Sequence, residues 1–271
     1  MKNPRKYGKA PFSVAVVHGG PGAAGELAPL ARELAGEWGV LEPLQTSSTL
    51  AGQIEELHKL LQRNGNLPVA LIGFSWGAWL AFILAARHPA VVKKLFLIGS
   101  GPFTEAYAAA VQRTRENRLT AQEKLQADSF ANILADPLSS RGKNQALARF
   151  GALLTRADAF DPLPLEPEAV DCRADIFQRV WPEAAELRRS GKLLAFATGI
   201  ACPLIAIHGD YDPHPADGVE KPLSGILRDF RFIRLEKCGH RPWIERHARE
   251  RFFYILKEEL RLPPAGAAPI Y

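Results

Sequence analysis

Cysteine is scarce in this chain of 271 residues, which contains Cys172, Cys202 and Cys238 and no others. An odd number of widely spaced cysteines argues against a disulfide framework, and no pair has the spacing of metal ligands. We therefore expect a protein of the reducing cytoplasm. Nothing in the sequence indicates a metal or a cofactor.

Long apolar runs and charge of one sign are also missing. The apolar run Val14–Val17 is too short for a signal peptide, and no stretch approaches the roughly 18 to 20 apolar residues of a membrane span. Lys and Arg (34) alternate with Asp and Glu (29) nearly everywhere, for a net charge of +5. The composition makes no case for a nucleic-acid or membrane partner.

Short apolar runs alternate with helical patterns in the first hundred and last seventy residues. The predicted strands are Ser13–Val17, Gly39–Glu42, Val69–Gly73, Leu95–Ile98, Leu204–His208 and Phe232–Leu235. The predicted helices are Glu26–Leu34, Leu50–Gln62, Trp76–Arg87, Pro215–Arg228 and Trp243–Leu260. Continuous apolar strands separated by helices are typical of a buried parallel sheet.

The alternation stops between about residues 102 and 201, where the pattern is helical and no strand is convincing. The predicted helices there are Thr104–Leu119, Ala121–Ala135, Gln145–Ala157 and Ala174–Leu194, with breaks at Pro162, Pro164 and Pro167. Because the alternation resumes at Cys202, an inserted helical cap is favoured over a separate domain. The predicted domains are a core of residues 1–101 and 202–271 and a cap of residues 102–201. We expect a loose tail over Pro263–Pro269.

The segment Gly73–Gly77 (GFSWG) fits the pattern G-x-S-x-G, which is weak alone. Here it follows an apolar strand and opens a helix, so Ser75 is expected on a tight turn with its hydroxyl projecting above the sheet. This context favours Ser75 as a nucleophile.

The segment His18–Gly22 (HGGPG) follows the first strand. A glycine-rich turn leaves backbone N–H groups accessible, so we assign the two donors of an oxyanion hole to the Gly20 and Trp76 amides. A phosphate-binding loop is the weaker alternative, since the full G-x-G-x-x-G spacing and a P-loop lysine are missing.

Candidates for the acid follow the strand Leu204–His208, at the sheet edge where open α/β sheets bind ligands. Asp210, Asp212 and Asp217 compete for this role. We favour Asp212 and interpret Asp210 as a residue that forms the loop or caps a helix.

The histidine candidate is His240, on a glycine-containing loop after the last strand. Histidine as a residue type has an unperturbed pKa near 6.5, so a histidine at this place can accept the serine proton and return it to a leaving group. His214 is the serious rival; His58, His88 and His247 lie in helical patterns and are interpreted as surface or packing residues. Cys238 lacks a separate base and is interpreted as a buried small residue.

Together, HGGPG and GFSWG resemble the motifs of the α/β-hydrolase superfamily, most closely its proline iminopeptidase-like branch. The resemblance implies a cofactor-free serine hydrolase with a cap inserted after Leu95–Ile98. Few residues precede the first strand, so we expect no opening hairpin and an essentially parallel sheet of about six strands. Acidic cap residues hold the substrate amine in iminopeptidases, which makes Glu183 and Glu186 candidates for that role.

The leading hypothesis is cleavage of a small-molecule acyl substrate, an ester, thioester, lactone or amide, through an acyl-enzyme. The alternatives are a prolyl-type aminopeptidase and a non-catalytic protein that binds a small molecule. Trp76, Phe103, Trp181 and Trp243 are candidates for an aromatic pocket, and Arg241 is interpreted as a structural ion-pair residue. The oligomeric state stays open.

Overall fold

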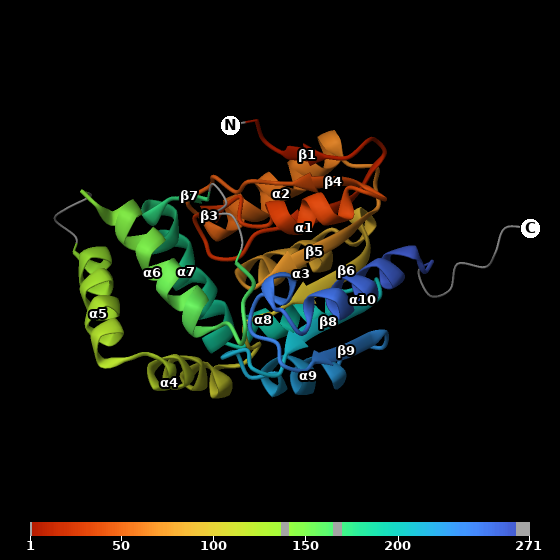
Figure 1. Cartoon of the computed structure of the whole chain (residues 1–271). Coiled ribbons are helices and arrows are strands. Elements are labelled where there is room, and N and C mark those ends of the chain that lie inside the picture. Colours follow the sequence, from red (N-terminus) through yellow and green to blue (C-terminus); the bar gives the residue numbers. More distant parts are fainter. Residues whose placement is uncertain (1, 137–140, 165–169, 264–271) are drawn as a thin grey trace, which may run out of the picture.

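A twisted sheet forms the centre of the computed structural model, which describes residues 2–136, 141–164 and 170–263 (Figure 1). Within these residues the sheet has seven strands in the order β1-β4-β2-β5-β6-β8-β9. They are β1 (Arg5–Tyr7), β4 (Gly39–Glu42), β2 (Phe12–Val17), β5 (Val69–Phe74), β6 (Val92–Ile98), β8 (Leu204–Gly209) and β9 (Phe230–Leu235). The expected mostly parallel sheet is confirmed.

The expectation of an essentially all-parallel sheet is wrong at one edge, although β1 and β2 form no hairpin with each other, as expected. β1 pairs antiparallel with β4, with Arg5 opposite Glu42. The Tyr7 hydroxyl donates to the buried Glu42 carboxylate at 2.7 Å, and burial together with Glu42 raises the pKa of Tyr7 to about 12. Three residues with polar side chains give no periodic signal, so this strand is held by contacts that its sequence pattern does not reveal.

Each face of the sheet packs against a separate hydrophobic layer. In β2, Val14 and Val16 belong to one layer and Ala15 and Val17 to the other, as the two-residue period of a strand requires. The first layer includes α1 (Ala28–Leu34) and α10 (Arg249–Arg261). The second includes α2 (Leu50–Asn64), α3 (Trp76–Arg87) and α9 (Asp217–Ser224).

The predicted helix Trp243–Leu260 is too long at its start. A 3-10 turn covers Pro242–Ile244, and α10 begins only at Arg249. The reason is Glu245, which is fully buried and accepts hydrogen bonds from the backbone N–H groups of Gly239, Phe160 and Asp161. These contacts hold the segment before α10 as a loop.

The segment between β6 and β8 is mainly helical and lies to one side of the sheet (Figure 1). Its helices are α4 (Ala108–Arg118), α5 (Ala121–Ala135), α6 (Lys143–Ala157), α7 (Ala174–Arg189) and α8 (Lys192–Ala195). The predicted helix Ala174–Leu194 is interrupted after Arg189, where Gly191 has φ +76°.

This segment also contains a strand that the sequence did not predict. β7 (Asp171–Cys172) pairs antiparallel with β3 (Ala23–Ala24), directly after the HGGPG turn. Two residues are too few for a strand pattern. Pro167 and the expected loose tail beyond residue 263 lie outside the described residues. Within the described part of the chain, no helix is long and apolar enough to cross a membrane.

Candidate active site

Ser75 occupies a strained turn between β5 and α3. Its φ of +53° and ψ of −116° lie outside the regions that non-glycine residues prefer. The flanking glycines are required by close backbone contacts: a Cβ on Gly73 would lie 2.3 Å from the Gly77 oxygen, and one on Gly77 would lie 2.3 Å from the Val17 oxygen. The tight packing of strand on helix therefore fixes the position of the serine.

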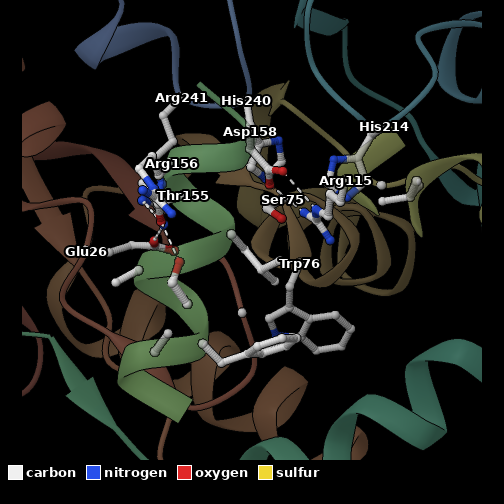
Figure 2. A pocket seen from close by; sticks show the side chains of 18 of the residues that line it. Glu26, Ser75, Trp76, Arg115, Thr155, Arg156, Asp158, His214, His240 and Arg241 are labelled. Atoms are coloured by element: carbon white, nitrogen blue, oxygen red, sulfur yellow. Dashed lines mark hydrogen bonds and ion pairs between the residues drawn. The ribbon is translucent and has the colours of Figure 1, made fainter. Parts of the chain in front are cut away.

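Ser75 opens into a cavity of about 1350 Å³ between the carboxyl edge of the sheet and helices α4 to α7. Gly20, Trp76 and His240 line the same cavity, and Figure 2 shows Ser75, Trp76 and His240 among the side chains that line it. Three elements far apart in the sequence therefore contribute to one pocket: the turn after β2, the turn after β5 and the loop after β9.

His240 is held by Asp212, which lies on the loop after β8. The Nδ1 atom of His240 and the Oδ2 atom of Asp212 are 2.8 Å apart, and both side chains are buried. Burial raises the pKa of Asp212, but His240, His208 and His214 outweigh it and hold the pKa well below its ordinary value. The carboxylate is therefore ionised, and it accepts the Nδ1 proton of His240.

His214, the rival base, binds the other oxygen of the same carboxylate. Its Nδ1 lies 2.8 Å from Asp212 Oδ1, and its backbone N–H donates to that oxygen at 2.9 Å. Burial lowers the pKa of His214 to about 4, so the ring is neutral near pH 7.

His208 belongs to this group as well, and sequence reasoning missed it because it lies at the end of a strand. Its Nε2 donates to the His214 carbonyl at 2.8 Å and lies 3.5 Å from Asp212 Oδ2. It therefore fixes the position of the His214 loop.

The two competing aspartates are placed elsewhere. Asp210 accepts the backbone N–H groups of Lys237 and Cys238, both at 3.1 Å, and so shapes the loop that carries His240. Asp217 forms an exposed ion pair with Lys221. Burial raises the pKa of the Cys238 thiol, which keeps it protonated and unsuited to nucleophilic attack.

The glycine-rich turn after β2 faces the serine elbow. Gly20 has φ +56° and Gly22 has φ +73°, and the Gly22 oxygen accepts the backbone N–H of Arg173 at 2.8 Å. Among the described residues, the backbone amides of Gly20 and Trp76 donate to no protein acceptor. Both amides are therefore free to bind an oxyanion.

Two ion pairs in the described part of the chain lie at the cavity wall. The sequence indicated an ion pair for Arg241, but it gave no sign of the one between Arg115 and Asp158. Arg115 of α4 binds Asp158, at the end of α6, through two hydrogen bonds of 2.8 and 2.6 Å. The Asp158 carbonyl accepts the backbone N–H of His240 at 3.0 Å. Arg241 binds Glu26 at 2.8 Å and Thr155 at 2.5 Å, which joins the His240 loop to the segment between β3 and α1 and to α6 (Figure 2).

The acidic residues considered for an amine site do not reach the cavity. Glu183 accepts the backbone N–H of Leu50 at 2.9 Å, and Glu186 is exposed and pairs with Arg189. Of the four aromatic candidates, Trp76, Trp181 and Trp243 line the cavity, whereas Phe103 is fully buried beside Phe82.

A strained serine after a parallel strand, an Asp–His pair after two later strands and a free pair of amides define the architecture of an α/β hydrolase. The family model described as alpha/beta hydrolase fold matches residues 42–245, and the chain belongs to this family. A comparison with curated proteins gives no match by sequence.

Solved structures with similar folds include several enzymes. VinJ superposes with a TM-score of 0.67 at 20% identity, over 95% of this chain and 93% of that one. The 2-hydroxy-6-oxo-6-phenylhexa-2,4-dienoate hydrolase of Rhodococcus sp. strain RHA1 gives 0.63 at 18% identity, over 94% and 92%. The proline iminopeptidase of Mycobacterium smegmatis gives 0.61 at 20% identity, over 95% and 93%. At these identities the likeness shows the fold.

Proposed function

We propose that this α/β hydrolase is a cofactor-free serine hydrolase that cleaves a small acyl substrate, an ester, thioester, lactone or amide, through an acyl-enzyme. The observation that carries the proposal is the 2.8 Å contact of Asp212 with His240, whose ring lines the same cavity as the strained Ser75. In this proposal Ser75 is the nucleophile, His240 the general base and Asp212 the acid that orients it.

The chemistry follows from the tautomer of His240. Because Nδ1 donates to Asp212, Nε2 of the neutral ring carries a lone pair and can accept the Ser75 proton as the hydroxyl attacks the substrate carbonyl. The negative oxygen of the tetrahedral intermediate would be bound by the Gly20 and Trp76 amides. His240 then gives its proton to the leaving group, and a water molecule repeats the sequence to release the acid.

The helices of residues 102–201 are proposed to act as a cap. Residues of α4, α5, α6 and α7 line the cavity opposite Ser75, so substrate would lie between them and the edge of the sheet. A prolyl-type aminopeptidase is the second candidate, favoured by the HGGPG and GFSWG motifs and by the fold similarity to a proline iminopeptidase. The positions of Glu183 and Glu186 weaken it, because neither can receive a substrate amine in the cavity.

A fluorescent fluorophosphonate probe tests the nucleophile directly. We expect the wild-type protein and Cys238→Ala to label and a folded Ser75→Ala to be unlabelled. Folded wild-type protein that does not label would contradict the proposal and favour a non-catalytic protein that binds a small molecule. A panel of short-chain esters measured beside prolyl anilides then separates the two enzymatic candidates.

A further inference from the structure

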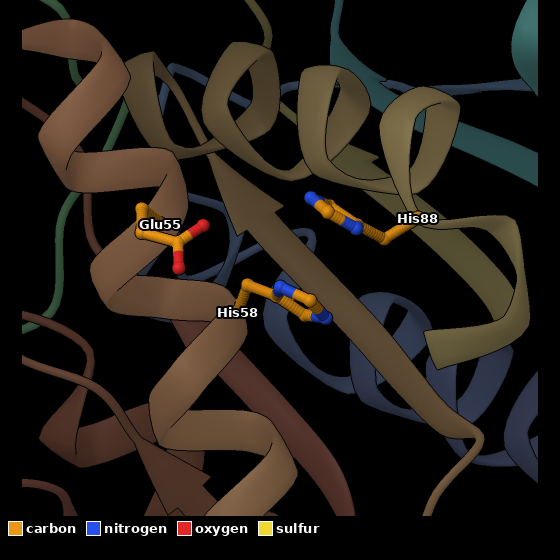
Figure 3. A group of neighbouring side chains, drawn as sticks. All are labelled: Glu55, His58 and His88. Carbon is orange, nitrogen blue, oxygen red and sulfur yellow. The ribbon is translucent and has the colours of Figure 1, made fainter.

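A second group of histidines lies away from the candidate active site, where α2 meets the end of α3 (Figure 3). Glu55 and His58 are three residues apart on α2, so they share one face of the helix. His88 is the residue that ends α3. One ligand atom from each of the three side chains lies within 4.8 Å of the other two.

The ligand atoms of this group are available. The rings of His58 and His88 stack with centroids 3.8 Å apart, and in the described part of the chain neither ring forms a hydrogen bond to another residue. Glu55 pairs with Lys59 at 3.0 Å, but both side chains are more than half exposed. An exposed pair of this kind contributes little, so a stronger ligand can displace Lys59.

The backbone beneath the group is well anchored. Ile54, Leu57 and Leu61 bury the adjoining face of α2, and the backbone N–H of His88 donates to the Leu84 carbonyl at 2.8 Å. The three Cα positions are therefore fixed by the core. The remaining freedom is in the side chains, and χ2 of histidine is a soft torsion that allows the rings to turn at low cost.

We propose that Glu55, His58 and His88 bind a divalent transition metal of the zinc class. Two imidazoles and one carboxylate form a ligand set that suits zinc or nickel, whereas magnesium and calcium prefer oxygen ligands. With zinc–nitrogen distances of about 2.1 Å, tetrahedral ligand atoms lie roughly 3.4 Å apart, so the rings must leave their stacked arrangement and converge. Water completes the fourth position. The negative end of the α3 dipole also favours a cation beside His88.

The metal would crosslink α2 to the end of α3 and take no part in acyl transfer. Ser75 precedes the first residue of α3 and His88 follows its last, a separation of roughly 18 to 20 Å at 1.5 Å per residue. Metal bound here stabilises the folded protein, because the unfolded chain does not hold the three ligands together. The proposal therefore stands apart from the proposed hydrolase activity.

Calorimetric titration of metal-free protein, purified without a histidine tag, with zinc chloride tests the site. We expect one zinc per chain and a zinc-dependent rise in the unfolding temperature. His58→Ala and His88→Ala should each weaken binding by at least about tenfold. His247→Ala is the matched control, because His247 is exposed and pairs with Asp161, and it should bind as the wild type.

Asp212, His214 and His240 could also hold a metal, so the titration includes His240→Gln. The proposal would be overturned if zinc binding is lost in His240→Gln but retained in His58→Ala and His88→Ala. It would also be overturned if the wild-type protein binds no zinc. Cobalt gives a second measurement: visible absorption of a tetrahedral cobalt complex should appear in the wild type and in His247→Ala. The same bands should be absent from both folded variants of the proposed site.

Discussion

Asp212 binds two histidines at once, with His240 on Oδ2 and His214 on Oδ1, each through Nδ1 at 2.8 Å. The centroids of the two rings lie 4.5 Å apart, so the rings would repel each other if both were protonated. Burial keeps His214 neutral near pH 7, which leaves the carboxylate free to stabilise a single imidazolium on His240. In the proposed mechanism that charge appears only while His240 holds the serine proton.

His214 should make the protein less stable as the solution becomes more acidic. Its pKa is about 4 in the folded protein against an ordinary 6.5, so between these values the unfolded chain binds a proton that the folded protein does not. Stability should fall as pH decreases from 6.5 to 4, by about 3 kcal/mol for this residue. Urea unfolding at several pH values in this range measures the effect.

The matched variant for that experiment is His214→Gln, which keeps an amide donor for Asp212 but does not titrate. We expect it to be less stable than the wild type at pH 7 and to lose less stability on acidification. Two other groups with lowered pKa values do not disturb this comparison. The lowered pKa of Asp212 changes stability only below its ordinary value of 3.8, which is outside this pH range. The lowered pKa of His88 affects the wild type and the variant equally. Equal slopes for the two proteins would show that His214 is not held neutral.

Asp212→Asn should reduce kcat by about 10⁴-fold on an ester substrate, because an asparagine no longer selects the tautomer with the Nδ1 proton. Ser75→Ala and His240→Ala should each lose at least as much, and the double variant should lose no more than either single one. Steady-state kinetics, with the enzyme concentration taken from absorbance, measures all four. Losses that add in the double variant would show that the two residues do not act as a unit.

The order of the candidate residues was visible in the sequence because each follows an apolar strand. Such strands are parallel, so their carboxyl ends meet at one edge, and Ser75, Asp212 and His240 are brought together there. The contact of Arg115 with Asp158 could not be predicted, since it depends on how α4 packs against α6. β1 and β7 could not be predicted for another reason. Segments of three and two residues are too short to show the alternation of apolar and polar residues that marks a strand, and their partner strands lie far away in the sequence.

Arg115→Ala should destabilise the protein by about 2 kcal/mol, because it leaves the buried Asp158 carboxylate without its partner. The loss of stability should be smaller than for a fully buried ion pair, since the Arg115 side chain is 22% exposed to solvent. Arg189→Ala is the control, because its pair with Glu186 is exposed on both sides, and its effect should be within about 0.5 kcal/mol. Urea unfolding compares them, and equal effects would contradict a buried ion pair beside His240.

Gly22→Ala should cost more stability than Gly142→Ala, although the two glycines have nearly the same backbone conformation, with φ +73° and +76°. Both substitutions carry the strain of a positive φ, about 1 kcal/mol. At Gly142 no atom of the described residues lies within 4 Å of the added Cβ, whereas at Gly22 it would lie 2.2 Å from the Arg173 carbonyl oxygen. Only Gly22→Ala must therefore push the glycine-rich turn away from Arg173, and with it the proposed Gly20 donor.

We expect urea unfolding to show the larger loss of stability for Gly22→Ala, and esterase assays to show reduced kcat for that variant alone. Equal losses of stability would mean that backbone strain, and not the contact with Arg173, sets the requirement for glycine at this turn.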